Sequence, residues 1–256
     1  MPPKYLAPSV TKAFEILRLV TKSAQGLKIS ALSKELGIGK STVHGITAAL
    51  EELGAIMRDP ATKRYRSGLT LLELGKAAYS QFDLKDLARP VMENLMEITQ
   101  ESVFLGVLNG EHITILDIVE SRNDLKITSP VGTALPLMAG AAGKVFLAEM
   151  NASRTSEIIH SKGIPRYTDN TATDPQQYFT EIEQVRKMGY ATDYEEYIPG
   201  VRAVAAPIRL NRHFSAAIWV VGFKMTLDDD KMKALIMATR EAAECISRKF
   251  EEQQLI

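Results

Sequence analysis

The stretch GIGKSTVH at residues 37–44 places a tight turn between two apolar runs. Its GKST resembles the end of a nucleotide-binding P-loop, which requires G-x-x-x-x-G-K-[ST] between a strand and a helix. The first glycine of that motif would fall on Lys34, and the preceding run has Ile29, Leu32 and Leu36 at helical spacing. A phosphate loop for ATP is therefore disfavoured, and a helix, a turn and a second helix are expected.

Two further apolar periodicities complete a three-helix pattern. The expected apolar face of the first helix consists of Val10, Ala13, Phe14, Leu17 and Val20. That of the third consists of Val43, Ile46, Leu50 and Leu53, and Gly54 ends this helix. Gly37 is expected to end the second helix, and Gly39 to permit the turn. Three helices with a glycine turn before the last one are typical of a helix-turn-helix motif.

A small hairpin is predicted after the third helix, in AIMRDPATKRYRSG. Asp59-Pro60 is a turn signal between two short strands. Lys63 and Arg64 would lie at its basic tip, against the DNA backbone beside the third helix, whereas Tyr65 is expected to pack inside. The hairpin makes the helix-turn-helix winged.

Charge is distributed unequally along this neutral chain. Residues 1–70 contain eleven Lys and Arg and five Asp and Glu, a net charge of +6. The remaining residues contain 20 basic and 26 acidic side chains, a net charge of −6. This division indicates that only the first part meets a polyanion, although an ordinary solvated surface is the alternative.

The first turns of the third helix are expected to contact DNA in the major groove. Lys40 can neutralise a phosphate, the Ser41 and Thr42 hydroxyls can bond phosphate oxygens, and His44 can reach a base edge. Alternatively, Ser41 is only the N-cap and His44 is an exposed residue without a role.

The rest of the chain predicts an α+β domain with an antiparallel sheet. Helices are expected over residues 69–79 and around 84–98, where Pro90 implies a kink or a helix start. Strand hairpins are expected around Asn109-Gly110 and around Asn211. Further helices are predicted from AGAAGKVFLAE, from residues 174–189 and from residues 228–253.

Several ordered motifs together resemble the IclR-type bacterial transcription regulators. They are SVTKAFEIL, the run from LSKELGIGKSTVH to LTLLELG, then PLMAGAAGKVFLAE and GYATDYEEYIPGVRAVAAPI. The resemblance implies a winged helix-turn-helix domain (1–70), a linker helix (71–82) and a GAF-like effector-binding domain (83–256). It also implies homodimers or dimers of dimers on promoter DNA and a small effector, often a carboxylate. One departure is Gly45, where the family commonly has arginine.

The resemblance also assigns an effector pocket. Met138, Gly140 and Ala141 lie in the MAGAAG loop, whose backbone N–H groups can hold a ligand carboxylate. Asp193 matches an acidic position that bonds a ligand hydroxyl or a neighbouring donor. The alternatives are close helix packing for the two small residues and a surface carboxylate for Asp193.

Three other pocket positions depart from relatives that bind two- or three-carbon oxo acids. Ala203, Trp219 and Val221 replace a thiol and two hydroxyls. The site therefore loses hydrogen-bonding capacity and gains an aromatic wall, although Trp219 can also be a core residue. The expected effector is a larger, aromatic or partly apolar acid, or the pocket is partly filled.

Other functional classes are weighed against the remaining residues. The histidines at 112, 160 and 213 lie in separate segments and Cys245 is the only cysteine, so neither an enzyme nor a metal site is expected and no cofactor is implied. No apolar run resembles a membrane span, and a cytoplasmic protein is expected. The alternatives to an effector-responsive regulator are an effector-independent repressor and, less favoured, a metal-binding regulator.

Overall fold

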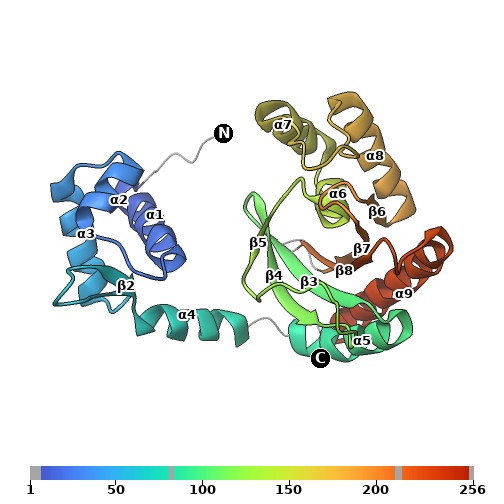
Figure 1. The fold of residues 1–256 in the computed structure, drawn as a ribbon, viewed down its shortest axis with the longest axis horizontal. Helices are drawn as coiled ribbons and strands as arrows, with labels where there is room; N and C mark the ends of the chain where they lie inside the picture. Colours follow the sequence, from blue (N-terminus) through green and yellow to red (C-terminus); the bar gives the residue numbers. More distant parts are fainter. Residues whose placement is uncertain (1–6, 81–83, 211–214, 254–256) are drawn as a thin grey trace. The chain divides into compact units, whose positions relative to one another are not determined.

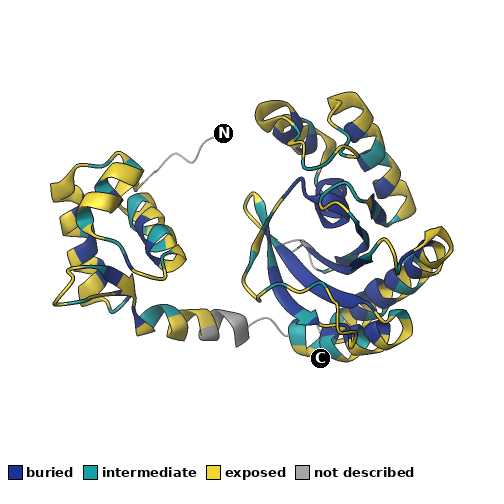
Figure 2. Ribbon diagram, viewed as in Figure 1, coloured by how far each residue is buried: buried dark blue, intermediate teal, exposed yellow. Residues whose placement is uncertain are grey.

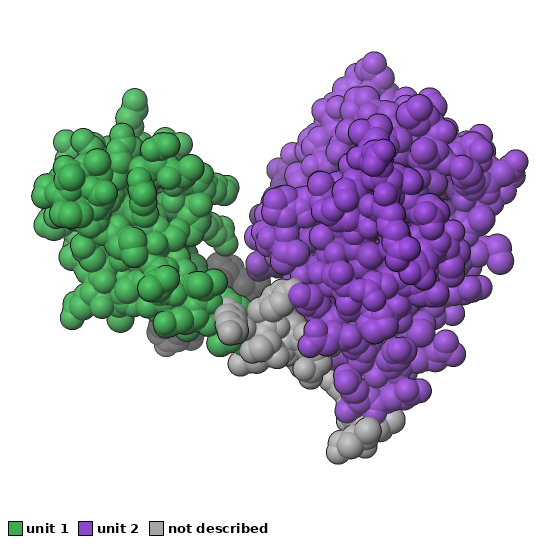
Figure 3. Space-filling model, turned by 60° about the horizontal axis from the view of Figure 1, so that its bottom comes forward, with its two compact units in different colours: residues 1–82 green, residues 83–256 purple. Residues whose placement is uncertain are grey.

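The computed structural model describes residues 7–80, 84–210 and 215–253 of the chain. It divides into two compact units, residues 1–82 and 83–256, which are coloured separately in Figure 3. Each unit has a hydrophobic core of its own.

The N-terminal unit contains three helices, a two-stranded hairpin and a fourth helix (Figure 1). The elements are α1 (Pro8–Lys22), α2 (Ile29–Leu36), α3 (Lys40–Glu52), β1 (Ile56–Arg58), β2 (Tyr65–Ser67) and α4 (Leu69–Ser80). Tyr65 is fully buried beneath the hairpin, as predicted. The winged helix-turn-helix is therefore confirmed.

Two predicted core residues of α1 face solvent instead. Val10 and Phe14 are exposed, while Ile16 and Val20 are buried in the core shared with α2 and α3. Ala13 and Leu17 pack against that core, so the expected stripe holds for Ala13, Leu17 and Val20 and is wrong for Val10 and Phe14. Figure 2 shows that α1 has both exposed and buried parts. Leu53 is likewise exposed, because α3 ends at Glu52 before Gly54 turns the chain at φ 69°.

The turn between α2 and α3 depends on Gly37. This residue adopts the left-handed conformation at φ 62° and donates its N–H to Ser33 O, which closes α2. Gly39 has φ −56° and ψ 139°, a conformation open to other residues, and is the N-cap of α3. The expectation that Gly39 permits the turn is corrected, because Gly37 alone needs left-handed geometry.

The C-terminal unit is built on one six-stranded antiparallel sheet in the order β5-β4-β3-β8-β7-β6. Its strands are β3 (Ser102–Asn109), β4 (His112–Val119), β5 (Ala134–Pro136), β6 (Ala191–Tyr194), β7 (Val201–Arg209) and β8 (Ser215–Phe223). Its helices are α5 (Leu84–Thr99), α6 (Gly140–Glu149), α7 (Ala152–Lys162), α8 (Pro175–Met188) and α9 (Asp229–Gln253). The α+β fold with an antiparallel sheet is confirmed.

Helices cover both faces of this sheet (Figure 1). Leu105, Val204 and Ile218 point into the core shared with α5 and α9, while Phe104 and Trp219 point into the core beneath α6 and α8. Successive residues of a strand face opposite sides, so strands buried on both sides read as continuous apolar runs. This explains sequences such as VRAVAAPI and AAIWVVGF.

Several local expectations are refined by the structure. The β3–β4 turn is Gly110-Glu111, because Asn109 pairs with His112 as the last strand residue. Pro90 lies within a continuous α5, neither starting nor ending it, and Ile98 is exposed. Asn211, expected at the β7–β8 turn, lies outside the described residues.

Three elements have no counterpart in the sequence-based prediction: β5, β6 and α7. The strands β5 and β6 are short edge strands, which carry little periodic signal. For α7 a signal existed. Asn151 caps the helix by accepting from Arg154 N at 2.8 Å, and Gly163 follows its last residue.

Candidate functional site

The exposed face of α3 carries a group of polar side chains. Lys40, Ser41, Thr42 and His44 are all exposed, whereas Val43 is fully buried between them. Gly39 is the N-cap, so the alternative that Ser41 caps the helix is wrong. Thr47 Oγ1 donates to His44 O at 3.0 Å and anchors this turn from inside.

Lys63 and Arg64, both expected at the basic tip of the hairpin, have different surroundings in the structure. Lys63 is exposed, with left-handed backbone at φ 58°, and the Asp59 carboxylate closes the tip by accepting from Ala61 N and Thr62 N. Arg64 is half-buried, and its Nη1 donates to Gly26 O at 2.8 Å. The Arg64 guanidinium therefore holds the hairpin to the chain before α2, and of the two basic residues only Lys63 is exposed at the tip.

A cavity of about 220 Å³ opens in the C-terminal unit between the sheet and the N-terminus of α6. Six predicted effector residues line it: Gly140, Ala141, Asp193, Ala203, Trp219 and Val221. The seventh, Met138, is not among the residues that line the cavity and is buried in the apolar core instead.

The wall formed by the sheet is aromatic. Phe104 and Trp219 stack with ring centroids 5.6 Å apart and planes 8° from parallel. Gly106 makes room for this pair, since a Cβ there would lie 2.7 Å from Trp219 Cη2. Trp219 is thus both a core residue and a cavity wall, so the two interpretations of the sequence hold together.

The opposite end of the cavity presents backbone donors. Ala139 is the N-cap of α6 without a side-chain hydrogen bond. Among the described residues, no acceptor is found for the N–H groups of Gly140, Ala141 and Ala142, although all three residues are buried. A buried helix N-terminus left open in this way is a ready acceptor site for an anion.

Asp193 lies beside these donors and is only 4% exposed. Its Oδ1 accepts from Glu196 N at 2.6 Å, and its Oδ2 lies against Gly140, where a Cβ would overlap it. Burial, reinforced by the charge of Glu196, raises the pKa of the Asp193 carboxyl to about 6. The alternative of a surface carboxylate is therefore wrong.

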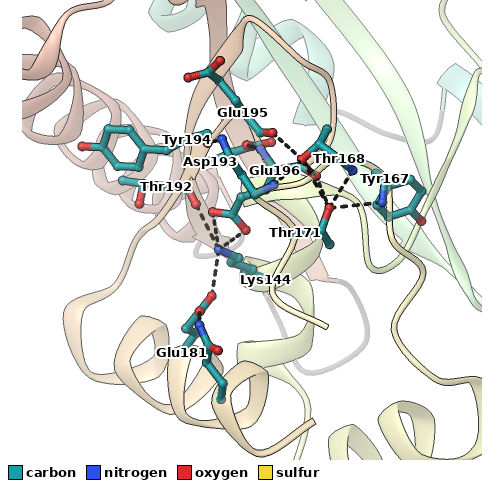
Figure 4. A network of polar contacts seen from close by, with 12 residues as sticks. Lys144, Tyr167, Thr168, Thr171, Glu181, Thr192, Asp193, Tyr194, Glu195 and Glu196 are labelled. Atoms are coloured by element: carbon teal, nitrogen blue, oxygen red, sulfur yellow. Dashed lines mark hydrogen bonds and ion pairs between the residues drawn. The ribbon is translucent and has the colours of Figure 1, made fainter. Parts of the chain in front are cut away.

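A buried ion-pair network supports this end of the cavity (Figure 4). Lys144 Nζ on α6 pairs with Glu196 Oε2 at 2.6 Å and Glu181 Oε2 at 3.0 Å. Burial alone would lower the pKa of Lys144, but the two carboxylates more than offset this and raise it. Thr168 Oγ1 and Thr171 Oγ1 both donate to Glu196 O, which joins the loop before α8 to the loop after β6. Through Lys144, the side chain of Glu196 also connects to α6 and to Glu181 on α8.

The model of the IclR helix-turn-helix domain matches residues 9–60, and that of the bacterial transcriptional regulator IclR C-terminal domain matches residues 76–248. The chain belongs to the IclR family. IclR proteins are DNA-binding transcription regulators, which is therefore the class of this protein.

Individual IclR relatives are similar in sequence over most of this chain. The HTH-type transcriptional regulator BhcR of Paracoccus denitrificans is 33% identical, covering 93% of this chain and 86% of its own. The transcriptional repressor IclR of Escherichia coli is 28% identical, covering 88% and 83%. The structure of an IclR homologue complexed with 4-hydroxybenzoate, from Microbacterium hydrocarbonoxydans, is 22% identical with a TM-score of 0.77, covering 95% and 99%.

Several cavity residues were missed from the sequence. Phe104 and Ile115 carry no motif, since only the folded sheet brings them to the cavity, whereas Tyr197 lies within the family motif GYATDYEEYIPGVRAVAAPI but was not singled out. Lys144 did carry a signal, being the single cation in the apolar helix AGAAGKVFLAE. A buried lysine requires carboxylate partners, although their positions, Glu181 and Glu196, could not be read from the sequence.

Within residues 7–80, 84–210 and 215–253, no three or more His, Cys, Asp or Glu side chains are grouped so as to hold a metal ion. No helix in those ranges has the length and apolar character needed to cross a membrane.

Proposed function

We propose that this IclR-family regulator binds promoter DNA under the control of a small organic acid, aromatic or partly apolar, held in the C-terminal cavity. The open N-terminus of α6 at the end of an apolar cavity carries this proposal. An acid group at these donors would supply the acceptors that buried N–H groups require.

The cavity wall supports an apolar body for this ligand. The side chains of Ala203 and Val221 offer no hydrogen bond, and Trp219 contributes aromatic surface to the wall. A two-carbon oxo acid would leave this wall without contacts, whereas a benzene ring would cover it. The IclR homologue with bound 4-hydroxybenzoate supports the same ligand class, through shared fold rather than sequence identity.

The intrinsic fluorescence of Trp219, the only tryptophan, tests the effector proposal directly. We expect benzoate or 4-hydroxybenzoate to quench it in a saturable manner and to raise the thermal midpoint by mass action. Glyoxylate and pyruvate are the matched small acids. Tight binding of these two acids alone would contradict the aromatic ligand class.

The alternative is a repressor that needs no effector. The same thermal measurement separates the two, because a ligand that binds the folded state must raise the midpoint. An unchanged midpoint across the acid panel would favour the alternative and would leave the DNA-binding function unaffected.

For the N-terminal unit, we propose that Lys40, Ser41, Thr42 and His44 on α3, together with Lys63, contact DNA. These side chains are exposed, and those of α3 gather on the face opposite the core. Arg64 supports the hairpin instead. Loss of promoter affinity in a variant with Lys40, His44 and Lys63 replaced by alanine is the test.

A further inference from the structure

We propose that Asp193 binds the carboxylate of the effector through a shared proton, so that each acid bound brings one proton into the cavity. This inference rests on the proposed function and deepens it. It makes Asp193 a residue that selects for acids and couples their affinity to pH.

The Asp193 carboxylate lies at the start of α6. Oδ2 lies so close to Gly140 that a Cβ there would overlap it. An acid that accepts from the N–H groups of Gly140 and Ala141 therefore comes within about 4–6 Å of Oδ2, the range over which two carboxylates disturb each other's ionisation. Two ionised carboxylates this close in a buried site repel strongly.

No cation lines the cavity to compensate for a second negative charge. Of the residues that line the cavity, only Asp193 and Tyr197 titrate, and neither Lys, Arg nor His is among them. The charge of Lys144 acts on Asp193, but Lys144 is held between Glu181 and Glu196, which already exceed it by one charge.

The other groups around Asp193 do not relieve the repulsion. From α8, Tyr178 is buried, and burial raises its pKa, so it stays neutral. Tyr167 and Tyr197, in the loops before α8 and after β6, also have raised pKa values through burial. The facing strands β3, β7 and β8 contribute Phe104, Ala203 and Trp219, which carry no charge.

A proton taken from solvent resolves this imbalance. The protonated Asp193 donates an O–H bond to one oxygen of the effector carboxylate, whose other oxygen accepts from the start of α6. The cost is small near neutral pH because burial already raises the pKa of Asp193 to about 6. Above this pKa, affinity for an acid falls tenfold for each pH unit.

Isothermal titration with benzoate and 4-hydroxybenzoate tests the proposal on the full-length protein. Paired buffers of different ionisation enthalpy report proton uptake directly. We expect about one half of a proton at pH 6 and nearly one at pH 8, with affinity falling about 50-fold between them. Benzamide, the neutral counterpart of benzoate, should bind without proton uptake.

The variant Asp193→Asn provides the second measurement. It retains a donor and an acceptor but no charge, so acid binding should become independent of pH and tighter than wild type at pH 8. Its folding is checked without ligand. Because the pKa of Asp193 is raised, its neutral carboxyl stabilises the folded wild type fully below about pH 4, and this contribution is lost as pH rises through about 6. At pH 8 the uncharged variant should therefore have a higher melting temperature than wild type.

The outcomes separate this inference from the proposed function. Acid binding without proton uptake, weakened by Asp193→Asn, would overturn the shared proton while the acid effector stands. Asp193 would then be an ionised acceptor for a ligand hydroxyl. Absence of acid binding by both proteins would overturn the proposed effector and the shared proton together.

Discussion

Gly45 and Gly140 show how differently one residue type acts in two helices. Gly45 is exposed in α3, and a Cβ there would meet no atom within 4 Å. Gly140 opens α6 at φ 55°, where a Cβ would overlap the Asp193 carboxylate. A larger side chain could therefore replace Gly45 without a clash, whereas the geometry of the cavity requires glycine at position 140.

Gly45→Ala should stabilise the protein. Alanine loses less backbone entropy in a helix, and the free energy of unfolding should rise by about 0.5–1 kcal/mol. Urea unfolding measures the change.

Gly140→Ala is the matched variant with the opposite sign. Its left-handed backbone and displaced carboxylate should lower the free energy of unfolding by at least about 1 kcal/mol and abolish acid binding. If Gly140→Ala proved neutral in both measurements, the packing of Asp193 on Gly140 would be wrong.

At the scale of elements, α4 is unusual for its exposed apolar side chains. Leu69, Leu72 and Leu74 are between 62% and 68% exposed. Isolated exposed leucines are common, but three within two turns indicate a contact surface. We propose that α4 packs in a homodimer, the assembly expected from the family resemblance.

Leu72→Glu should weaken this dimer. Burying a leucine contributes about 1.5–3 kcal/mol, so the dissociation constant should rise about 10- to 100-fold. Sedimentation velocity over a concentration series measures it. Leu125→Glu, at nearly equal exposure (66% against 68%) in the other unit, is the control and should leave the dimer intact. Equal effects from both substitutions would exclude α4 as the specific interface.

At the scale of the whole molecule, the net charge is divided between the first 70 residues and the rest of the chain. The net charge is +6 for residues 1–70 and −6 for the rest. DNA binding releases counterions, so affinity falls steeply with salt in proportion to the phosphates neutralised. The basic part should therefore dominate the salt dependence of promoter binding.

Replacing Lys40, His44 and Lys63 by alanine should lower promoter affinity and reduce the salt slope by about 2, since two lysines are lost. Electrophoretic or fluorescence titration of the protein's own upstream DNA at several salt concentrations measures both. Arg18→Ala with Lys22→Ala removes the same charge from exposed positions of α1 and should leave the slope nearly unchanged. Equal loss in both variants would mean that charge alone, rather than this surface, binds DNA.

Local sequence patterns predicted the elements whose ends are set by neighbouring residues. The cap Asp174 and the end Gly189 of α8, the glycine turn at Gly37 and the long helix α9 all follow from neighbouring residues. The family motifs pointed to six of the residues that line the cavity. By contrast, the stripe on α1 was misplaced at Val10 and Phe14, since periodicity cannot tell which of two adjacent faces meets a partner.

The sequence by itself determined the helix-turn-helix, the antiparallel hairpin of β3 and β4 and the division of charge, because each depends on residues close together in the chain. Only the tertiary structure decided that Arg64 anchors the hairpin, that Lys144 lies between Glu181 and Glu196, and that Asp193 rests on Gly140. These contacts join segments about 40 to 50 residues apart, and the energy of a buried charge depends on which partners the fold brings to it.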